Sequence, residues 1–295
     1  MDNQSPFDLH SSEAYALWRS FKLDTAPRRA EDILVEIADP FRLSQLELDK
    51  LLKLNAVCNM AIYVSNCGQN PDKQIPLKIG GQLGLEHLDN NWLADEDALT
   101  PIAVNSTDNH PSRAGYIPYT NRAIGWHTDG YYNSPQKLVR SVILHCVHSA
   151  TWGGSNSLLD HEIAYILLRD QHPELVATLC RQDAMCIPAR QEGQVTMRAE
   201  QSGPVFSGED FLHMRYTARS VSINWGTAKA AQAAAALQAI IENQAKPWVL
   251  QTRLQPGMGL VSNNVLHNRA AFSDDKNQLP RLLYRARYYQ RIRRS

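Results

Sequence analysis

The feature that most constrains the fold is a succession of short apolar segments separated by turns containing glycine or proline. The segment SVILHCV at residues 141–147 has the β-branched, apolar composition of a buried strand. Later in the chain, WVLQTRL, the turn LQPGMG, LVSNNVL and RLLYRARYYQRI (281–292) are typical of strand, turn, strand and a last long strand. Many short strands of this kind favour a β-sandwich or jelly roll.

Helical patterns precede and interrupt these strands. In SQLELDKLLKL the leucines recur at roughly helical spacing, and the strand-like NMAIYVS follows. HEIAYILLRDQHPELVATL predicts a helix broken near Pro173, and an alanine-rich helix starts near Ala228 and ends before Pro247. We therefore expect a mixed α/β, mainly β chain with a double-stranded β-helix (jelly-roll) core decorated by helices. We expect one domain over 1–295, with an N-terminal helix and strand elaboration over about 1–110 and the core over about 111–295.

The composition excludes several classes of partner. Thirty Lys and Arg balance thirty Asp and Glu, so the chain has no general electrostatic attraction to nucleic acid or to an anionic membrane. No apolar run approaches the ~18 residues of a membrane span, and MDNQSPFDLH has neither the basic nor the apolar region of a signal peptide. The five cysteines are odd in number and form no CxxC pair, which favours reduced thiols. We expect a cytoplasmic protein, with a homo-oligomer left open.

One candidate site lies in GWHTDGYYN, residues 125–133. On a strand, His127 and Asp129 would leave the same face, so that an imidazole and a carboxylate converge. They would supply two of the three ligands of the two-histidine, one-carboxylate site of non-haem iron oxygenases. His87 and Asp89 have the same spacing, but they lie in a Gly- and Asn-rich region with little strand character. Taken alone, His127 and Asp129 would be interpreted first as a hydrogen-bonded surface pair.

A third ligand is His267, at the end of the strand that follows the Pro-Gly turn, although a lone histidine there could also be a core residue. Arg281, Arg285 and Arg287 share strand parity, so we expect all three on one face. One of these guanidinium groups could bind a carboxylate through two parallel hydrogen bonds, and the alternative is a solvated basic edge strand. His145 and His148 have opposite parity, so we exclude them as a ligand pair.

These residues resemble the taurine dioxygenase/TfdA family of Fe(II)- and 2-oxoglutarate-dependent oxygenases. HTD is followed far along the chain by a histidine and then an arginine, and YTNRAIGWHTD, LHCV, GGSNSLLD and LQPGMGLVSNNVLHNRAAF resemble the gamma-butyrobetaine hydroxylase branch in order and spacing. The resemblance implies that His127, Asp129 and His267 bind Fe(II), and that Arg281 binds the distal carboxylate of 2-oxoglutarate. The family usually has Thr or Ser after its Gly-Gly turn to help bind that carboxylate. Without a gap this position is Asn156, and a shift of one residue makes it Ser157.

The resemblance also implies a reaction. The enzyme would use O₂ and 2-oxoglutarate to hydroxylate a small polar metabolite, such as an amino acid, a betaine or a sulfonate-like compound, and would release succinate and CO₂. Arg285 would bind an anionic group of the substrate. Tyr119 and Tyr131, with Tyr116 and Tyr132, could line the substrate pocket or hold an ammonium group. The alternatives are a non-catalytic 2-oxoglutarate-binding protein and a zinc hydrolase that uses the same three ligands.

Overall fold

The computed structural model describes residues 5–90, 98–104, 116–192, 194–219 and 223–293. The chain forms two compact units, and each unit is assembled from separate stretches of sequence. The first unit comprises Met1–Ala26, Trp126–Leu138 and Leu159–Val249, and the second comprises Pro27–Gly125, Val139–Leu158 and Leu250–Ser295. The boundary expected near residue 110 lies outside the described residues, and the single domain over 1–295 stays a prediction.

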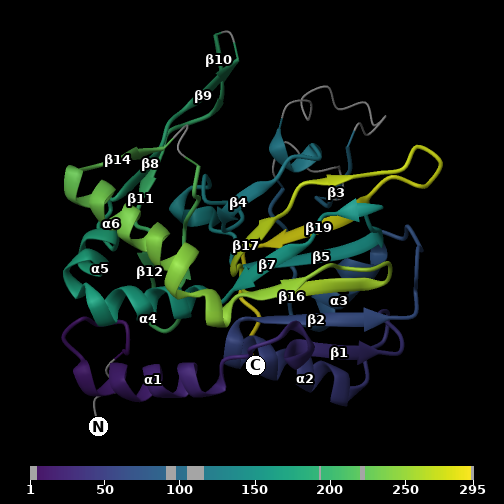
Figure 1. Ribbon diagram of the computed structural model, residues 1–295, viewed down its shortest axis with the longest axis horizontal. Coiled ribbons are helices and arrows are strands. Elements are labelled where there is room, and N and C mark those ends of the chain that lie inside the picture. The colour runs from purple at the N-terminus through teal and green to yellow at the C-terminus, as the bar shows by residue number, and fades with distance from the viewer. Residues whose placement is uncertain (1–4, 91–97, 105–115, 193, 220–222, 294–295) are drawn as a thin grey trace. The chain divides into compact units, whose positions relative to one another are not determined.

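A six-stranded sheet is the centre of the second unit, with the strand order β1-β2-β16-β5-β19-β3 (Figure 1). β1 and β2 are parallel, and the other neighbours are antiparallel. The strand predicted at 141–147 is confirmed as β5, in which all residues but the last are buried. The strands are β1 (Leu34–Ile37), β2 (Met60–Ser65), β3 (Thr100–Ile102), β5 (Ser141–His148), β16 (Met258–Ser262) and β19 (Leu282–Tyr288).

Two helices, α2 (Gln45–Cys58) and α3 (Gln74–Gln82), cover one face of this sheet. The leucine pattern predicted α2 correctly: Leu51 is buried against the sheet, and Leu48 and Leu52 pack beside it. A capping box between Ser44 and Glu47 fixes the first turn of α2. The helix ends where Asn59 adopts a left-handed conformation, with φ of 62°.

The opposite face of the sheet carries a second apolar core, to which Leu158 and Leu250 contribute from another sheet. The order of that sheet is β15-β7-β17-β4. Its strands are β15 (Leu250–Thr252), β7 (Asn156–Leu159), β17 (Leu266–Arg269) and β4 (Ile124–His127), and a small ribbon pairs β6 (Trp152–Gly153) with β18 (Phe272–Ser273).

Two strand predictions need correction. LVSNNVL is not one strand, because β16 ends at Ser262 and Asn264 has a φ of 53°. His267 therefore lies on β17, in a different sheet from the strand that follows the Pro-Gly turn. The last strand is also shorter than expected, since Arg281 precedes β19 and the pairing register shifts between Leu282 and Leu283. Simple parity therefore does not relate Arg281 to the later arginines.

The first unit is mainly helical. The predicted break at Pro173 separates α4 from α5, and the alanine-rich helix is α6, which Thr227 caps. Lys22 of α1 is buried and forms ion pairs of 2.6 Å with both Asp160 and Glu162, the first of which caps α4. The helices are α1 (Ser12–Thr25), α4 (His161–Gln171), α5 (Pro173–Leu179), α6 (Ala228–Ala239) and the π-helical η5 (Ile240–Gln244).

Short strands and turns complete the described residues. Three small sheets in the first unit have the orders β11-β8-β14, β10-β9 and β12-β13. Their strands are β8 (Met185–Ile187), β9 (Arg190–Glu192), β10 (Val195–Arg198), β11 (Gln201–Gly203), β12 (Phe206–Ser207), β13 (His213–Met214) and β14 (Asn224–Trp225). The 3₁₀ turns are η1 (Ala30–Ile33), η3 (Ile117–Tyr119), η4 (Pro135–Lys137) and η6 (Lys246–Trp248).

All five cysteines are free. Cys58 and Cys146 are buried, Cys67 and Cys186 are half-buried, and Cys180 is exposed. Among the described residues, no helix combines the length and the apolar character needed to span a bilayer.

Candidate active site

The HTD segment starts on a strand and continues beyond it. β4 ends at His127, so Asp129 lies beyond the strand. The strand is therefore shorter than the one that would place both side chains on one face. The backbone is nevertheless held by residues 216–218. The amide of Thr128 donates to the carbonyl of Tyr216 at 2.9 Å, and the amide of Ala218 donates to the carbonyl of Trp126 at 2.8 Å. These bonds fix the direction in which the half-buried His127 and the buried Asp129 leave the backbone.

His267 lies on β17, where its Nδ1 is 3.0 Å from the carbonyl oxygen of Val265. A carbonyl only accepts, so Nδ1 carries the proton and Nε2 keeps its lone pair for a ligand. One ligand atom each from His127, Asp129 and His267 lie within 4.8 Å of one another. Within the part of the chain that the structure describes, this is the one group of three or more such side chains close enough for a metal. Two imidazoles and a carboxylate are the donor set of the non-haem Fe(II) site.

His87 and Asp89, the other histidine and aspartate with this spacing, do not belong to this group. Asp89 is buried, pairs with Arg287 at 2.6 Å, and accepts a hydrogen bond of 2.8 Å from the hydroxyl of Tyr289. His87 is exposed. Arg287, which parity made a candidate for binding a carboxylate ligand, is instead paired with a carboxylate of the protein.

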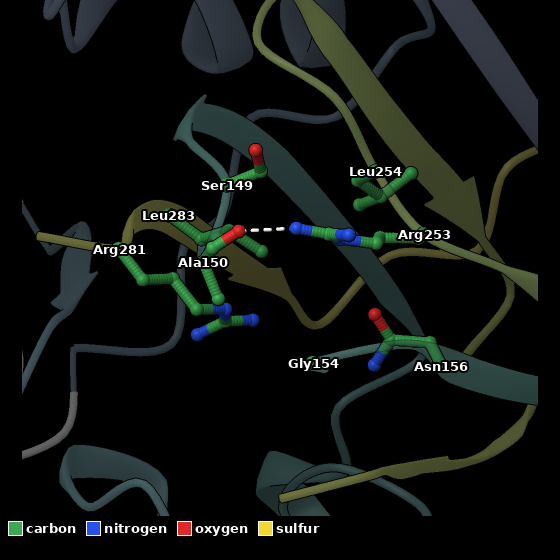
Figure 2. Close-up of a pocket in the computed structure, with 8 residues that line it drawn as sticks. All are labelled: Ser149, Ala150, Gly154, Asn156, Arg253, Leu254, Arg281 and Leu283. Carbon is green, nitrogen blue, oxygen red and sulfur yellow. Dashed lines mark hydrogen bonds between the residues drawn. The ribbon is translucent and has the colours of Figure 1, made fainter. Parts of the chain in front are cut away.

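A small pocket lies in the second unit, and Figure 2 shows Arg281 reaching into it from one side. The side chain of Arg281 is 5% exposed, and its Nη1 is buried without a hydrogen-bond partner among the described residues. Burial lowers the pKa of this guanidinium. No acidic residue lines the pocket. Its lining residues are Ser149, Ala150, Gly154, Asn156, Arg253, Leu254, Arg281 and Leu283.

The Gly-Gly turn determines which residue faces this pocket. Gly153 and Gly154 have φ of 73° and 72°, a conformation that favours glycine, and β7 follows. Asn156 lines the pocket, whereas Ser157 does not and is bonded to Gln251. Neighbouring residues of a strand point to opposite faces, so only one of the two can face Arg281.

Sequence reasoning missed two arginines near this pocket. Arg253 lines it, and Arg269 is buried with hydrogen bonds to the carbonyls of Pro118, Thr120 and Arg122. Arg269 and Arg281 both lie against the ring of Phe272, at 4.9 and 5.0 Å. Burial, and the nearby Arg281, lower the pKa of Arg269 to about 9. Strand parity with His267 could have identified Arg269, but no sequence signal marks Arg253.

The expected substrate residues fall in both units. Tyr119 is buried in η3, and Arg285 is buried on β19 opposite Leu144, both in the second unit. Tyr131 belongs to the first unit, where its ring contacts Tyr132 edge-on at 5.2 Å.

The first unit also places a cation beside these two tyrosines. Arg198 lies over the ring of Tyr132 at 5.5 Å, and burial lowers the pKa of its guanidinium. Its Nη2 donates to the carbonyl of Pro188 at 2.7 Å. No pattern in the sequence selects Arg198.

His145 has a partner of its own. It is fully buried, its Nδ1 lies 2.8 Å from the hydroxyl of Tyr63, and the two rings stack. Burial lowers the pKa of His145 to about 4, so the imidazole is neutral.

Two imidazoles and a carboxylate beside a cationic pocket are what a non-haem iron dioxygenase requires, and comparison with known proteins gives the family of the chain. Residues 93–287 match the family described as taurine catabolism dioxygenase TauD, TfdA family, and the chain belongs to that family. The family uses Fe(II), 2-oxoglutarate and O₂, which confirms the cofactors and the enzyme class that the sequence implied.

Two curated relatives share a name. The chain is 30% identical over 200 residues to a uridine-5'-phosphate dioxygenase of Streptomyces sp, covering 65% of this chain and 69% of the relative. It is 29% identical over 206 residues to a uridine-5'-phosphate dioxygenase of Amycolatopsis sp, covering 66% and 69%. These names do not support the resemblance to the gamma-butyrobetaine hydroxylase branch, although the family expectation was correct.

Solved structures share the fold at low identity. An asparagine oxygenase in complex with Fe(II), 3-hydroxyasparagine and succinate has a TM-score of 0.61 at 14% identity, covering 83% of this chain and 80% of its own. The non-heme iron oxygenase OrfP in complex with Fe and alpha-ketoglutaric acid has a TM-score of 0.61 at 16% identity, covering 84% and 81%. The chain is thus a strand-rich α/β protein with the fold of these oxygenases.

Proposed function

We propose that the protein is an Fe(II)- and 2-oxoglutarate-dependent dioxygenase that oxidises a small anionic metabolite. The observation that carries the proposal is the buried guanidinium of Arg281, which faces a pocket without acidic lining residues. The Asp274 carboxylate acts on this charge, but Nη1 is a buried donor without a hydrogen-bond partner among the described residues. Such a donor is costly, and a bound carboxylate would remove that cost. The strand arrangement expected for such a site is the double-stranded β-helix.

In this proposal His127, Asp129 and His267 hold Fe(II). The close approach of their ligand atoms and the donor set fit that ion. Three protein ligands leave positions open for the 2-oxo acid and O₂, and the bound iron supplies the oxidising chemistry. The bond from Nδ1 of His267 to the carbonyl of Val265 orients the ring and fixes its tautomer.

Arg281 would bind the distal carboxylate of 2-oxoglutarate. Asn156, rather than Ser157, would take the place of the Thr or Ser by which the family helps to bind this carboxylate, because Asn156 lines the pocket with Arg281. The ring of Phe272 and the small Gly154 lie against the Arg281 side chain and restrict it, which reduces the entropy lost when a carboxylate binds.

The substrate would carry an anionic group. Arg285, Tyr119 and Tyr131 remain the proposed substrate residues. The half-buried Arg198 over Tyr132 adds a cation and an aromatic face close in sequence to Asp129. A phosphate and a planar base would suit such a pair, and the curated relatives make uridine 5'-phosphate the first compound to test. Amino acids, betaines and sulfonates are the next candidates.

Anaerobic addition of Fe(II) and 2-oxoglutarate tests the reaction class. A weak visible charge-transfer band is expected on chelation, whereas a zinc hydrolase with the same ligands would give none. Succinate release is then measured with uridine 5'-phosphate, asparagine, arginine and taurine. Cosubstrate binding without succinate formation from any compound would favour the non-catalytic alternative.

Uncharged analogues test the anionic substrate. For an active phosphate or acid, the corresponding nucleoside, methyl ester or amide should be turned over poorly, because a buried arginine would lose its partner. Equal turnover of the neutral analogue would contradict the proposal.

A further inference from the structure

Arg253 and Arg281 enter the same pocket from opposite sides (Figure 2). The Nη2 of Arg253 donates to the carbonyl of Ala150 and, at 3.2 Å, to that of Thr151. Both bonds use the same nitrogen, and these carbonyls hold the guanidinium at the pocket wall. The other nitrogens of Arg253 make no hydrogen bond with the described residues, so they are available to a ligand.

Asn156 stands where the family usually has a hydroxyl. One hydrogen of its Nδ2 is donated to the carbonyl of Asn268 at 2.9 Å, so at most one N–H remains for a ligand, and its Oδ1 only accepts. An amide N–H is a neutral donor, so a second cation in the pocket lining would strengthen the binding of the distal carboxylate.

Arg253 also lines a second, wider depression. The residues that line this depression are Gln69, His148, Ser149, Ala150, Thr151, Arg253, Gln278 and Leu279. Ser149, Ala150 and Arg253 line both spaces. Arg253 is the one charged side chain that the two described linings share, and it is exposed towards the depression.

We propose that Arg253 is a second cosubstrate-binding residue, which donates with Arg281 to the distal carboxylate and limits the length of the 2-oxo acid. The inference rests on the proposed function, because it assumes that 2-oxoglutarate occupies this pocket. With Arg253 in place, the pocket ends at its guanidinium. Without it, the pocket opens into the depression and accepts a longer acid.

The test is calorimetric titration of 2-oxoglutarate and 2-oxoadipate into the Mn(II)-loaded protein, which reports binding without turnover. Arg281→Ala should weaken 2-oxoglutarate binding by roughly 100-fold, and Arg253→Ala by about tenfold, because Arg253 is more exposed and keeps fewer nitrogens for the ligand. The preference for 2-oxoglutarate over 2-oxoadipate should fall several-fold in Arg253→Ala alone.

The controls separate this inference from the proposed function. Gln278→Ala changes the depression but not the pocket, and should bind both acids as the wild type does. Arg253→Gln keeps a donor for the two carbonyls without the charge, and guards against misfolding of the alanine variant.

If the wild type binds no 2-oxoglutarate, the proposed function fails. A second result overturns only the role of Arg253. In that result the wild type binds 2-oxoglutarate, Arg281→Ala does not, and both Arg253 variants bind both acids as the wild type does.

Discussion

His87-Leu88-Asp89 and His127-Thr128-Asp129 have the same spacing of histidine and aspartate, yet the two segments differ in what surrounds them. In the first, the imidazole is exposed and the carboxylate is paired with Arg287. In the second, both side chains lie within reach of His267. A three-residue pattern can therefore form a metal site only where a remote third side chain meets it.

The backbone partners explain the difference. The first segment pairs with the end of β19: the amide of Asp89 donates to the carbonyl of Arg287, and the amide of Tyr289 donates to that of His87. That pairing brings the Asp89 carboxylate to a buried cation. Residues 126–128 pair instead with 216–218, which offer the HTD segment backbone groups.

The largest expected effect is the loss of a proposed ligand from the second segment. Asp129→Ala or His267→Ala should reduce Fe(II)-dependent succinate formation by at least ~100-fold. Mutation of a residue that only hydrogen-bonds to a metal ligand already lowers metal affinity or activity by roughly 10–100-fold. Succinate release and bound iron per protein are the measurements. Full activity in either variant would contradict the ligand assignment.

The matching change in the first segment should affect stability instead. Asp89→Ala removes the carboxylate that neutralises Arg287 in a buried pair, which typically costs ~3–5 kcal/mol. Urea unfolding should show this loss, and the folded fraction should keep its iron. Asp89→Asn, which retains an acceptor for Tyr289, should lose less. A variant that stays stable but loses iron would make Asp89 a ligand after all.

Local patterns predicted the elements that bury a continuous apolar face. The leucine spacing of α2 and the apolar run of β5 fixed their type and approximate position, because burial of those side chains stabilises one conformation. The pairing of Asp89 with Arg287 was not predictable in this way. It depends on the register between residues 87–89 and the end of β19, which no local pattern encodes.

The pocket lined by Arg253 and Arg281 shows the same limit of prediction from sequence. Resemblance to the family selected Arg281, but neither parity nor motif selected Arg253, whose position depends on the turn after β15. The register shift near Leu283 also separates Arg281 from the parity of β19, and such shifts leave no mark in a single sequence.

His145, which belongs to neither segment, should make the stability of the fold depend on pH. His145 is buried with its pKa lowered to about 4, and its Nε2 has no hydrogen-bond partner among the described residues. The neutral form is favoured in the folded state, so this contribution to stability is complete above pH 6.5 and is lost as the pH falls towards 4. The loss should reach about 3 kcal/mol.

Urea unfolding of the wild type and of His145→Gln at pH 7.5 and 4.5 measures this contribution. The variant should lose less stability between the two pH values, since glutamine does not titrate. Equal losses in the two proteins would place the acid sensitivity elsewhere.

The smallest effect is expected for His87→Ala. The imidazole is exposed, and the recorded hydrogen bonds of this residue use its backbone: its amide donates to Oε1 of Gln290 at 2.6 Å, and its carbonyl accepts from Tyr289. Alanine keeps both bonds, so the free energy of unfolding should change by no more than about 0.5 kcal/mol. Succinate formation and bound iron should equal those of the wild type. If His87→Ala lost its iron and His127→Ala kept it, the roles of the two segments would be exchanged. The metal would then be bound by the segment whose imidazole is exposed.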